Sequence, residues 1–121
     1  SASTCMKVKI DKRDDVAVLT VSGTLMSGPN VVPFQHYVEE VMAEDILNVV
    51  VDFSKVKWFG STMLGVLATS LKMLRDAGGD LRLAGIATRM ESLMMVGQLS
   101  SHFRAFESVD TAIESFVSEP P

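Results

Sequence analysis

Runs of alternating and continuous apolar residues divide the chain into short strands. Residues 7–11 alternate polar with apolar side chains, which is the period of a half-buried strand. A polar turn at 13–15 leads to the more apolar strand 16–21, close enough in sequence to form a hairpin with the first. The β-branched run at 47–53 lies between helical segments. It is therefore predicted to be the central strand, between 16–21 and the short strand 81–84.

Four other segments carry apolar residues at helical spacing. They cover residues 31–43, 62–77, 88–96 and 109–117, and a last short strand is predicted at 103–106. Pro33 falls in the first turn of the first helix, where its missing N–H costs little, and Ser108 caps the last helix. The predicted order is β-β-α-β-α-β-α-β-α. This is an α/β domain whose sheet of about five strands is mixed and mostly parallel, with four helices.

Composition supports one ordinary globular domain. The chain has 121 residues, of which 47% are hydrophobic and 21% charged, and this is enough to bury a core without metals or disulfides. We predict a domain over residues 6–117, a C-terminal tail over 118–121, and a disordered or artificial leader over 1–5. The sequence shows no secretory signal and no run of about 20 apolar residues. With a single cysteine, Cys5, these features predict a cytoplasmic protein without direct membrane insertion.

Charge and motif searches exclude several classes of function. The net charge is −4, and the basic residues near the start are interleaved with aspartates, so nucleic acid is not an expected partner. His36 and His102 lie in different elements and lack Cys or acidic companions at ligand spacing, which predicts no metal site. There is no glycine-rich phosphate loop, and Cys5 has no base beside it. We therefore expect no cofactor and no enzymatic activity.

The segment from Val49 to Leu67 is the most informative. A buried strand leads through a loop into a helix, with Ser61 placed as N-cap and Thr62 as the first helical residue. Simple capping is one interpretation of these hydroxyls. The other is that a hydroxyl is exposed at the carboxyl edge of the sheet, where helical N–H groups also favour a phosphate.

This segment resembles the signature of STAS domains, and in particular of the anti-sigma-factor antagonists. The likeness rests on the strand Val50–Val56 followed by Gly60–Leu67, and it continues over nearly all of residues 6–117. Further matching segments are Val21–Leu25, Gly78–Ala84, Val96–Leu99 and Phe106–Ala112. No single motif is strongly specific, whereas their order and spacing together are.

The resemblance implies a protein-binding module that regulates transcription and is switched by phosphorylation. In that family the unphosphorylated protein binds an anti-sigma factor that is also a serine/threonine kinase, the kinase then phosphorylates a hydroxyl, and a phosphatase resets the cycle. The matching position here is Thr62, with Ser61 as the second choice. The expected partner-binding residues are Met26, Ser27, Gly60, Ser61, Thr62, Met63, Val66 and Met73. We expect a monomer or a weak dimer.

Alternatives remain at this stage. Gly60, Met63 and Met26 replace residues that the family pattern has as Asp, Gly and an acid, which favours a second hypothesis: a constitutive STAS adaptor or scaffold without a phosphorylation cycle. A small nucleotide-binding domain or enzyme is the weakest alternative. The extra apolar arc of the second helix, with Met63, Val66 and Met73, is either a docking face or packs on the third helix through Met90 and Met94.

Overall fold

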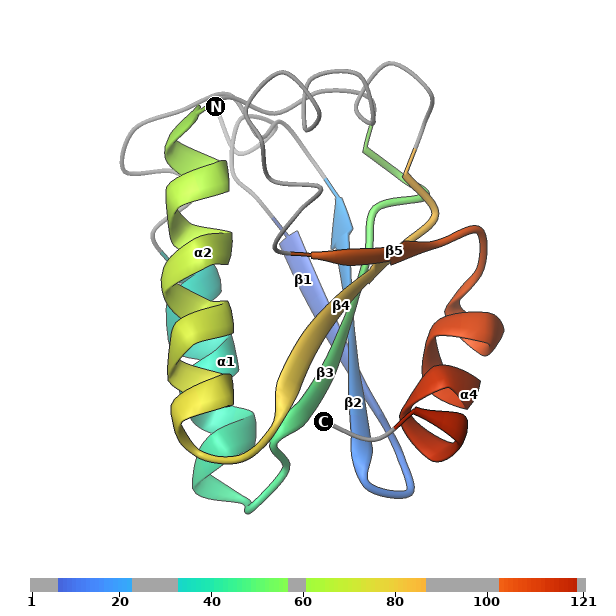
Figure 1. Cartoon of the computed structure of the whole chain (residues 1–121). Coiled ribbons are helices and arrows are strands. Elements are labelled where there is room, and N and C mark those ends of the chain that lie inside the picture. The colour runs from blue at the N-terminus through green and yellow to red at the C-terminus, as the bar shows by residue number, and fades with distance from the viewer. Residues whose placement is uncertain (1–6, 23–32, 57–60, 87–102, 120–121) are drawn as a thin grey trace.

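A computed structural model describes residues 7–22, 33–56, 61–86 and 103–119 (Figure 1). Strands and helices follow one another in the predicted order within these ranges. The elements are β1 (Lys7–Arg13), β2 (Val16–Ser22), α1 (Pro33–Ala43), β3 (Asn48–Asp52), α2 (Ser61–Asp76), β4 (Asp80–Ala84), β5 (Arg104–Phe106) and α4 (Val109–Ser118). The predicted helix over 88–96 lies outside the described residues, so the fold class is confirmed and that helix stays a prediction.

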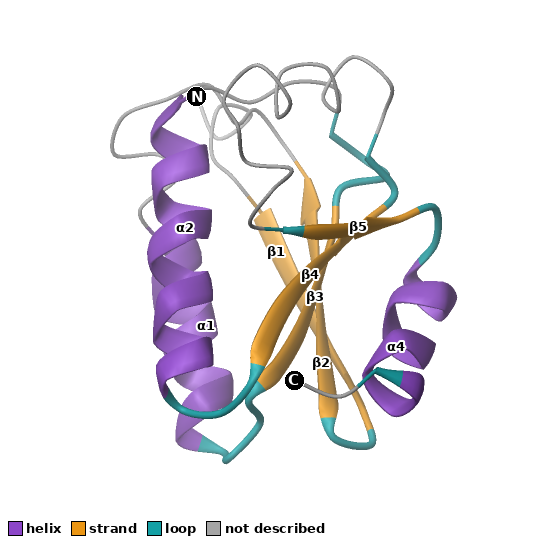
Figure 2. Ribbon diagram, viewed as in Figure 1, coloured by secondary structure: helices purple, strands orange, loops and turns teal. Residues whose placement is uncertain are grey.

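The sheet has the strand order β1-β2-β3-β4-β5 (Figure 2). β1 and β2 form the predicted antiparallel hairpin, and every later pair is parallel. Leu19, Val51 and Leu83 are aligned across the three middle strands. The prediction that the β-branched run at 47–53 forms the central strand is thus confirmed. A β-branched run is favoured there because both faces of a central strand are covered.

Helices cover both faces of this sheet. Figure 1 shows α1 and α2 on one side and α4 on the other. Alternate residues of each inner strand enter opposite cores, as the two-residue period of a strand requires. The larger core, with α1 and α2, takes strand residues such as Ala17, Leu19, Val49, Val51, Leu81 and Leu83. The smaller core, with α4, takes Val16, Val18, Val50 and Ala84.

Helix α2 packs on the sheet through a face rotated from the predicted one. Leu67, Leu71 and Leu74 are buried as expected. Leu64 is half-buried and packs against the larger core, whereas Ala68 is exposed, so the prediction that Ala68 faces the sheet is wrong. Met63 and Ser70, which were not expected on this face, are fully buried. The contacts between α1 and α2 explain the rotation, because a helix flanked by a neighbour and a sheet buries the arc between both.

The turn from α2 to β4 fixes the end of the helix. Gly78 has a φ of +100°, and the amides of Gly78 and Gly79 donate to the carbonyls of Arg75 and Leu74, the pattern of a Schellman cap. A Cβ on Gly79 would lie 1.8 Å from the Leu47 carbonyl oxygen. This close approach explains why two successive glycines stand here, and the predicted helix end is confirmed.

At the other end of the chain, α4 begins as predicted. The Ser108 hydroxyl accepts from the Thr111 amide at 3.2 Å, and the Thr111 hydroxyl receives the Ser108 amide in return. This reciprocal capping box satisfies two helical N–H groups.

Candidate partner-binding surface

The first turn of α2 carries both hydroxyl residues singled out in the sequence. Helix α2 begins at Ser61, one residue earlier than the capping assignment predicted, so Ser61 and Thr62 are its first two residues. The Thr62 side chain is half-buried. Figure 1 shows this turn at the end of the domain to which the carboxyl ends of β2, β3 and β4 point. The structure therefore brings Thr62 to the predicted edge. Met26, Ser27 and Gly60 lie outside the described residues.

Met63 does not belong to the surface. Its side chain is fully buried and forms part of the larger core. Its expected role as a partner-binding residue is thus wrong for the folded domain. The physical reason is the rotation of α2 described above, which turns Met63 inward together with Leu67 and Leu74.

Val66 and Met73 share a flank of α2 with Thr62. At 100° per residue, positions 62, 66 and 73 fall within one narrow sector of the helix. All three side chains are half-buried, and both apolar ones pack against the larger core. The flank formed by Thr62, Val66 and Met73 is therefore a partly apolar strip. Its two apolar side chains are partly exposed and also pack against the core.

Small side chains form the exposed face beside this flank. Gly65, Ala68 and Thr69 are exposed, and a Cβ on Gly65 would meet nothing within 4 Å. Thr69 lies next to the Thr62 flank, whereas Ala68 lies about 100° further round the helix. The sequence reasoning placed Ala68 on the sheet and so missed this shallow face. Gly65 was the sequence signal for this exposed face. A glycine inside a long helix lowers its stability, and no close packing at Gly65 requires one.

The loop after β3 is held at the same edge by specific contacts. The Asp52 carboxylate accepts from the Ser54 amide at 2.9 Å, and the Phe53 amide donates to the Ala84 carbonyl at 2.9 Å. Gly85 has a φ of +68°, and a Cβ there would lie 2.9 Å from the Asp52 carboxylate. The carboxyl ends of β3 and β4 are thus tied together at this end of the sheet.

A buried charged cluster on the opposite side of the sheet was not foreseen. Arg82 of β4 and Asp80 are 3% and 5% exposed, and their side chains form an ion pair at 3.0 Å. The second carboxylate oxygen of Asp80 accepts from Arg75 at 2.9 Å. An arginine between two leucines of a buried strand was the sequence signal for this cluster. Its partners, Ser115 and Glu119 of the C-terminal segment, could not be read from the sequence.

An exposed ion pair closes the same C-terminal segment. Arg104 contacts Glu119 at 2.9 Å. The hydrogen bond from Arg104 lowers the pKa of the Glu119 carboxyl below its ordinary value and raises the pKa of Arg104.

Among the described residues no group of three or more His, Cys, Asp or Glu side chains could hold a metal ion. Within the same residues no helix is long and apolar enough to cross a membrane.

The sequence profile of the STAS domain matches residues 7–112, which is most of the chain. The chain belongs to the STAS domain family. No curated protein sequence gives a significant match to this STAS protein.

Several solved structures share its fold at low identity. TM1081 of Thermotoga maritima is 20% identical, with a TM-score of 0.80 over 91% of this chain and 88% of that one. An anti-sigma factor antagonist from Mycobacterium paratuberculosis is 22% identical, with a TM-score of 0.79 over 95% of this chain and 97% of its own. Unphosphorylated SpoIIAA, also an anti-sigma factor antagonist, is 11% identical, with a TM-score of 0.70 over 93% and 99%. At these identities the likeness shows the fold.

Proposed function

We propose that this STAS protein is an anti-sigma factor antagonist, a non-enzymatic cytoplasmic module that regulates transcription by binding an anti-sigma factor kinase. Phosphorylation of Thr62 would release the partner, and a phosphatase would reset the cycle. The family membership and the fold shared with SpoIIAA support this proposal. SpoIIAA has also been solved in a phosphorylated form.

The observation that carries the proposal is the position of Thr62. It lies in the first turn of α2, half-buried, beside the exposed face that includes Gly65 and Thr69. A phosphate there adds about −1.5 to −2 charges to a contact surface. The helix itself tolerates an anion at its N-terminus, so the added charge acts on the partner rather than on the fold.

Incubation with the candidate kinase and ATP, followed by intact mass and peptide mapping, tests the switch. We expect one added phosphate on Thr62, and none in Thr62→Ala. Thr62→Glu should weaken partner binding by about 1–3 kcal/mol in calorimetry, while Thr62→Ala preserves it. Val117→Glu is the matched control, because Val117 is 82% exposed on α4, on the other side of the sheet. Phosphorylation elsewhere, or equal loss in the control, would contradict the proposal.

Two neighbouring substitutions map the rest of the surface. Thr69→Glu and Ala68→Glu add the same charge to exposed sites of α2, but only Thr69 borders the Thr62 flank. We expect Thr69→Glu to weaken binding and Ala68→Glu to leave it unchanged, with similar melting temperatures. Val66→Asp is a poorer probe, because Val66 packs against the core and an unpaired carboxylate there would also destabilise the fold.

A constitutive STAS adaptor is the second candidate. Three departures from the family's phosphorylation motif favour it. Gly60 and Met26 stand where the family has acidic residues. Met63, which is fully buried, stands where the family has a glycine. Partner binding that is equal in Thr62→Ala and Thr62→Glu, with no added phosphate, would select the adaptor.

A further inference from the structure

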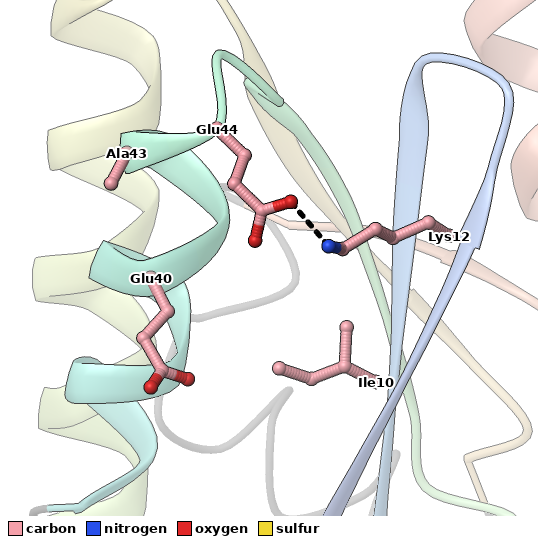
Figure 3. Close-up of a pocket in the computed structure, with 5 residues that line it drawn as sticks. All are labelled: Ile10, Lys12, Glu40, Ala43 and Glu44. Carbon is pink, nitrogen blue, oxygen red and sulfur yellow. Dashed lines mark hydrogen bonds and ion pairs between the residues drawn. The ribbon is translucent and has the colours of Figure 1, made fainter.

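A groove is lined by residues of β1, of α1 and of the turn after α1. Figure 1 shows these segments at the end of the domain away from the first turn of α2. The groove has a volume of about 520 Å³ and is lined by Ile10, Lys12, Glu40, Ala43 and Glu44. Figure 3 shows Ile10 and Lys12 reaching from β1 toward the helix, with Glu40 on α1 and Glu44 in the turn that follows it. Ile10 and Ala43 give it an apolar part, and the glutamates give it an acidic rim.

The charge of this groove is incompletely neutralised. Lys12 forms an ion pair with Glu44, but among the described residues no contact is seen for the exposed Glu40 carboxylate. The last turn of α1 contains no basic residue, and the carbonyl end of a helix adds further negative potential. The groove therefore complements a cationic side chain.

β1 also leaves one backbone edge open. Its seven residues all pair with β2 on one side, and within the described part of the sheet no strand pairs on the other side. Such an edge presents unpaired N–H and C=O groups to an incoming strand. A second copy of β1 is disfavoured there, since two strands rich in lysine and arginine would lie side by side.

We infer that the β1 edge and this groove together bind an extended segment of a partner protein that carries lysine or arginine on its α1-facing side. The segment adds to the sheet beside β1, places its cationic side chains at Glu40 and Glu44, and packs an aliphatic residue on Ile10. This second interface lies apart from Thr62, so it does not depend on the proposed phosphorylation switch.

The probe is a short synthetic peptide in which one face carries lysine, valine and lysine and the other face threonine. Titrated into isotope-labelled protein, it should produce saturable amide shifts over Lys7–Arg13 and Glu40–Glu44. Two further peptides keep the length. One has glutamate in place of lysine, and the other is N-methylated at alternate amides so that it cannot pair with a strand edge. Both should bind at least about tenfold more weakly.

Glu40→Lys should reduce the peptide affinity by about tenfold or more. Glu39→Lys is the matched control, because Glu39 is exposed on the same helix but does not line the groove, and it should change the affinity little. Equal loss in both variants, or equal binding of the N-methylated peptide, would overturn the proposal in favour of diffuse charge attraction. A dimer in sedimentation that is broken by the peptide would overturn it in favour of a second copy.

Discussion

The guanidinium of Arg82 on β4 donates a hydrogen bond of 2.8 Å to the hydroxyl of Ser115 on α4, and both side chains are almost fully buried. The same guanidinium donates to the Glu119 carbonyl at 2.9 Å and stacks 4.1 Å from the centre of the Phe116 ring. A single cation on the sheet thus contacts three residues at the C-terminal end of α4: Ser115, Phe116 and Glu119. Because Asp80 balances its charge, the C-terminal helix is held by a polar latch as well as by apolar packing.

Loss of the Arg82 guanidinium should destabilise the folded protein. We expect Arg82→Met to lower the free energy of unfolding by about 3–5 kcal/mol, because the buried Asp80 carboxylate loses one of its two arginines. Combining it with Asp80→Asn should recover part of the loss. Chemical denaturation measures both. Lys72→Met, which breaks an exposed ion pair with Asp76 on α2, is the control and should cost no more than about 0.5 kcal/mol. Equal stability of Arg82→Met and the control would refute the latch.

The same glycine-to-alanine substitution should have opposite effects at two positions. Gly65 is exposed in the middle of α2 with open space around it, so Gly65→Ala should stabilise the fold by about 0.5–1 kcal/mol. Gly79→Ala would place a methyl group against the Leu47 carbonyl and should destabilise it strongly. Thermal melting distinguishes the two, and a stabilised Gly79→Ala variant would show that the turn is arranged differently.

Ser70 is a buried hydroxyl without a hydrogen-bond partner in the described structure. Ser70→Ala removes the desolvated group and raises helix propensity, so we expect a gain of about 1–2 kcal/mol in the free energy of unfolding. Thr69→Ala, at the exposed neighbouring position, should gain only a few tenths of a kcal/mol. A Ser70→Ala variant less stable than the parent would mean that the hydroxyl has an unrecognised partner.

The Arg104–Glu119 pair predicts a pH-dependent contribution to stability. The hydrogen bond from Arg104 lowers the pKa of Glu119 in the folded state below its ordinary value of about 4.5. The stabilising effect is therefore fully present above that ordinary value and is lost as the pH falls through the lowered pKa. We expect Glu119→Gln to melt slightly below the parent at neutral pH, and this difference to disappear as the pH falls through the lowered pKa of Glu119. Glu114→Gln, on α4 just before Glu119, is the control. A difference that persists in acid would exclude titration of Glu119 as its cause.

Local signals in the sequence were sufficient for the order and the type of the described elements. The β-branched run around Val50, the glycines at 78 and 79, and the Ser108 cap each act through neighbouring backbone groups. A local reading of the chain therefore predicts them correctly. Ser61 missed its predicted position by one residue, because the exact start of a helix depends on which amide first forms an intrahelical bond. The sequence also predicted that Thr62 lies at the carboxyl edge of the sheet, and the first turn of α2 lies at that edge (Figure 1).

Contacts between distant segments were decided only by tertiary structure. Met63 is fully buried and Ala68 is exposed because of where α1 lies against α2, and helical periodicity alone does not contain that angle. Arg82 meets Ser115, and Lys12 meets Glu44, across more than 30 residues of sequence. An amphipathic pattern reports that a residue has an apolar or polar environment, but not which element supplies it. For this chain the sequence determined the STAS fold and the candidate hydroxyl. The packing of α1, α2 and α4 on the sheet determined which side chains remain at the surface for a partner.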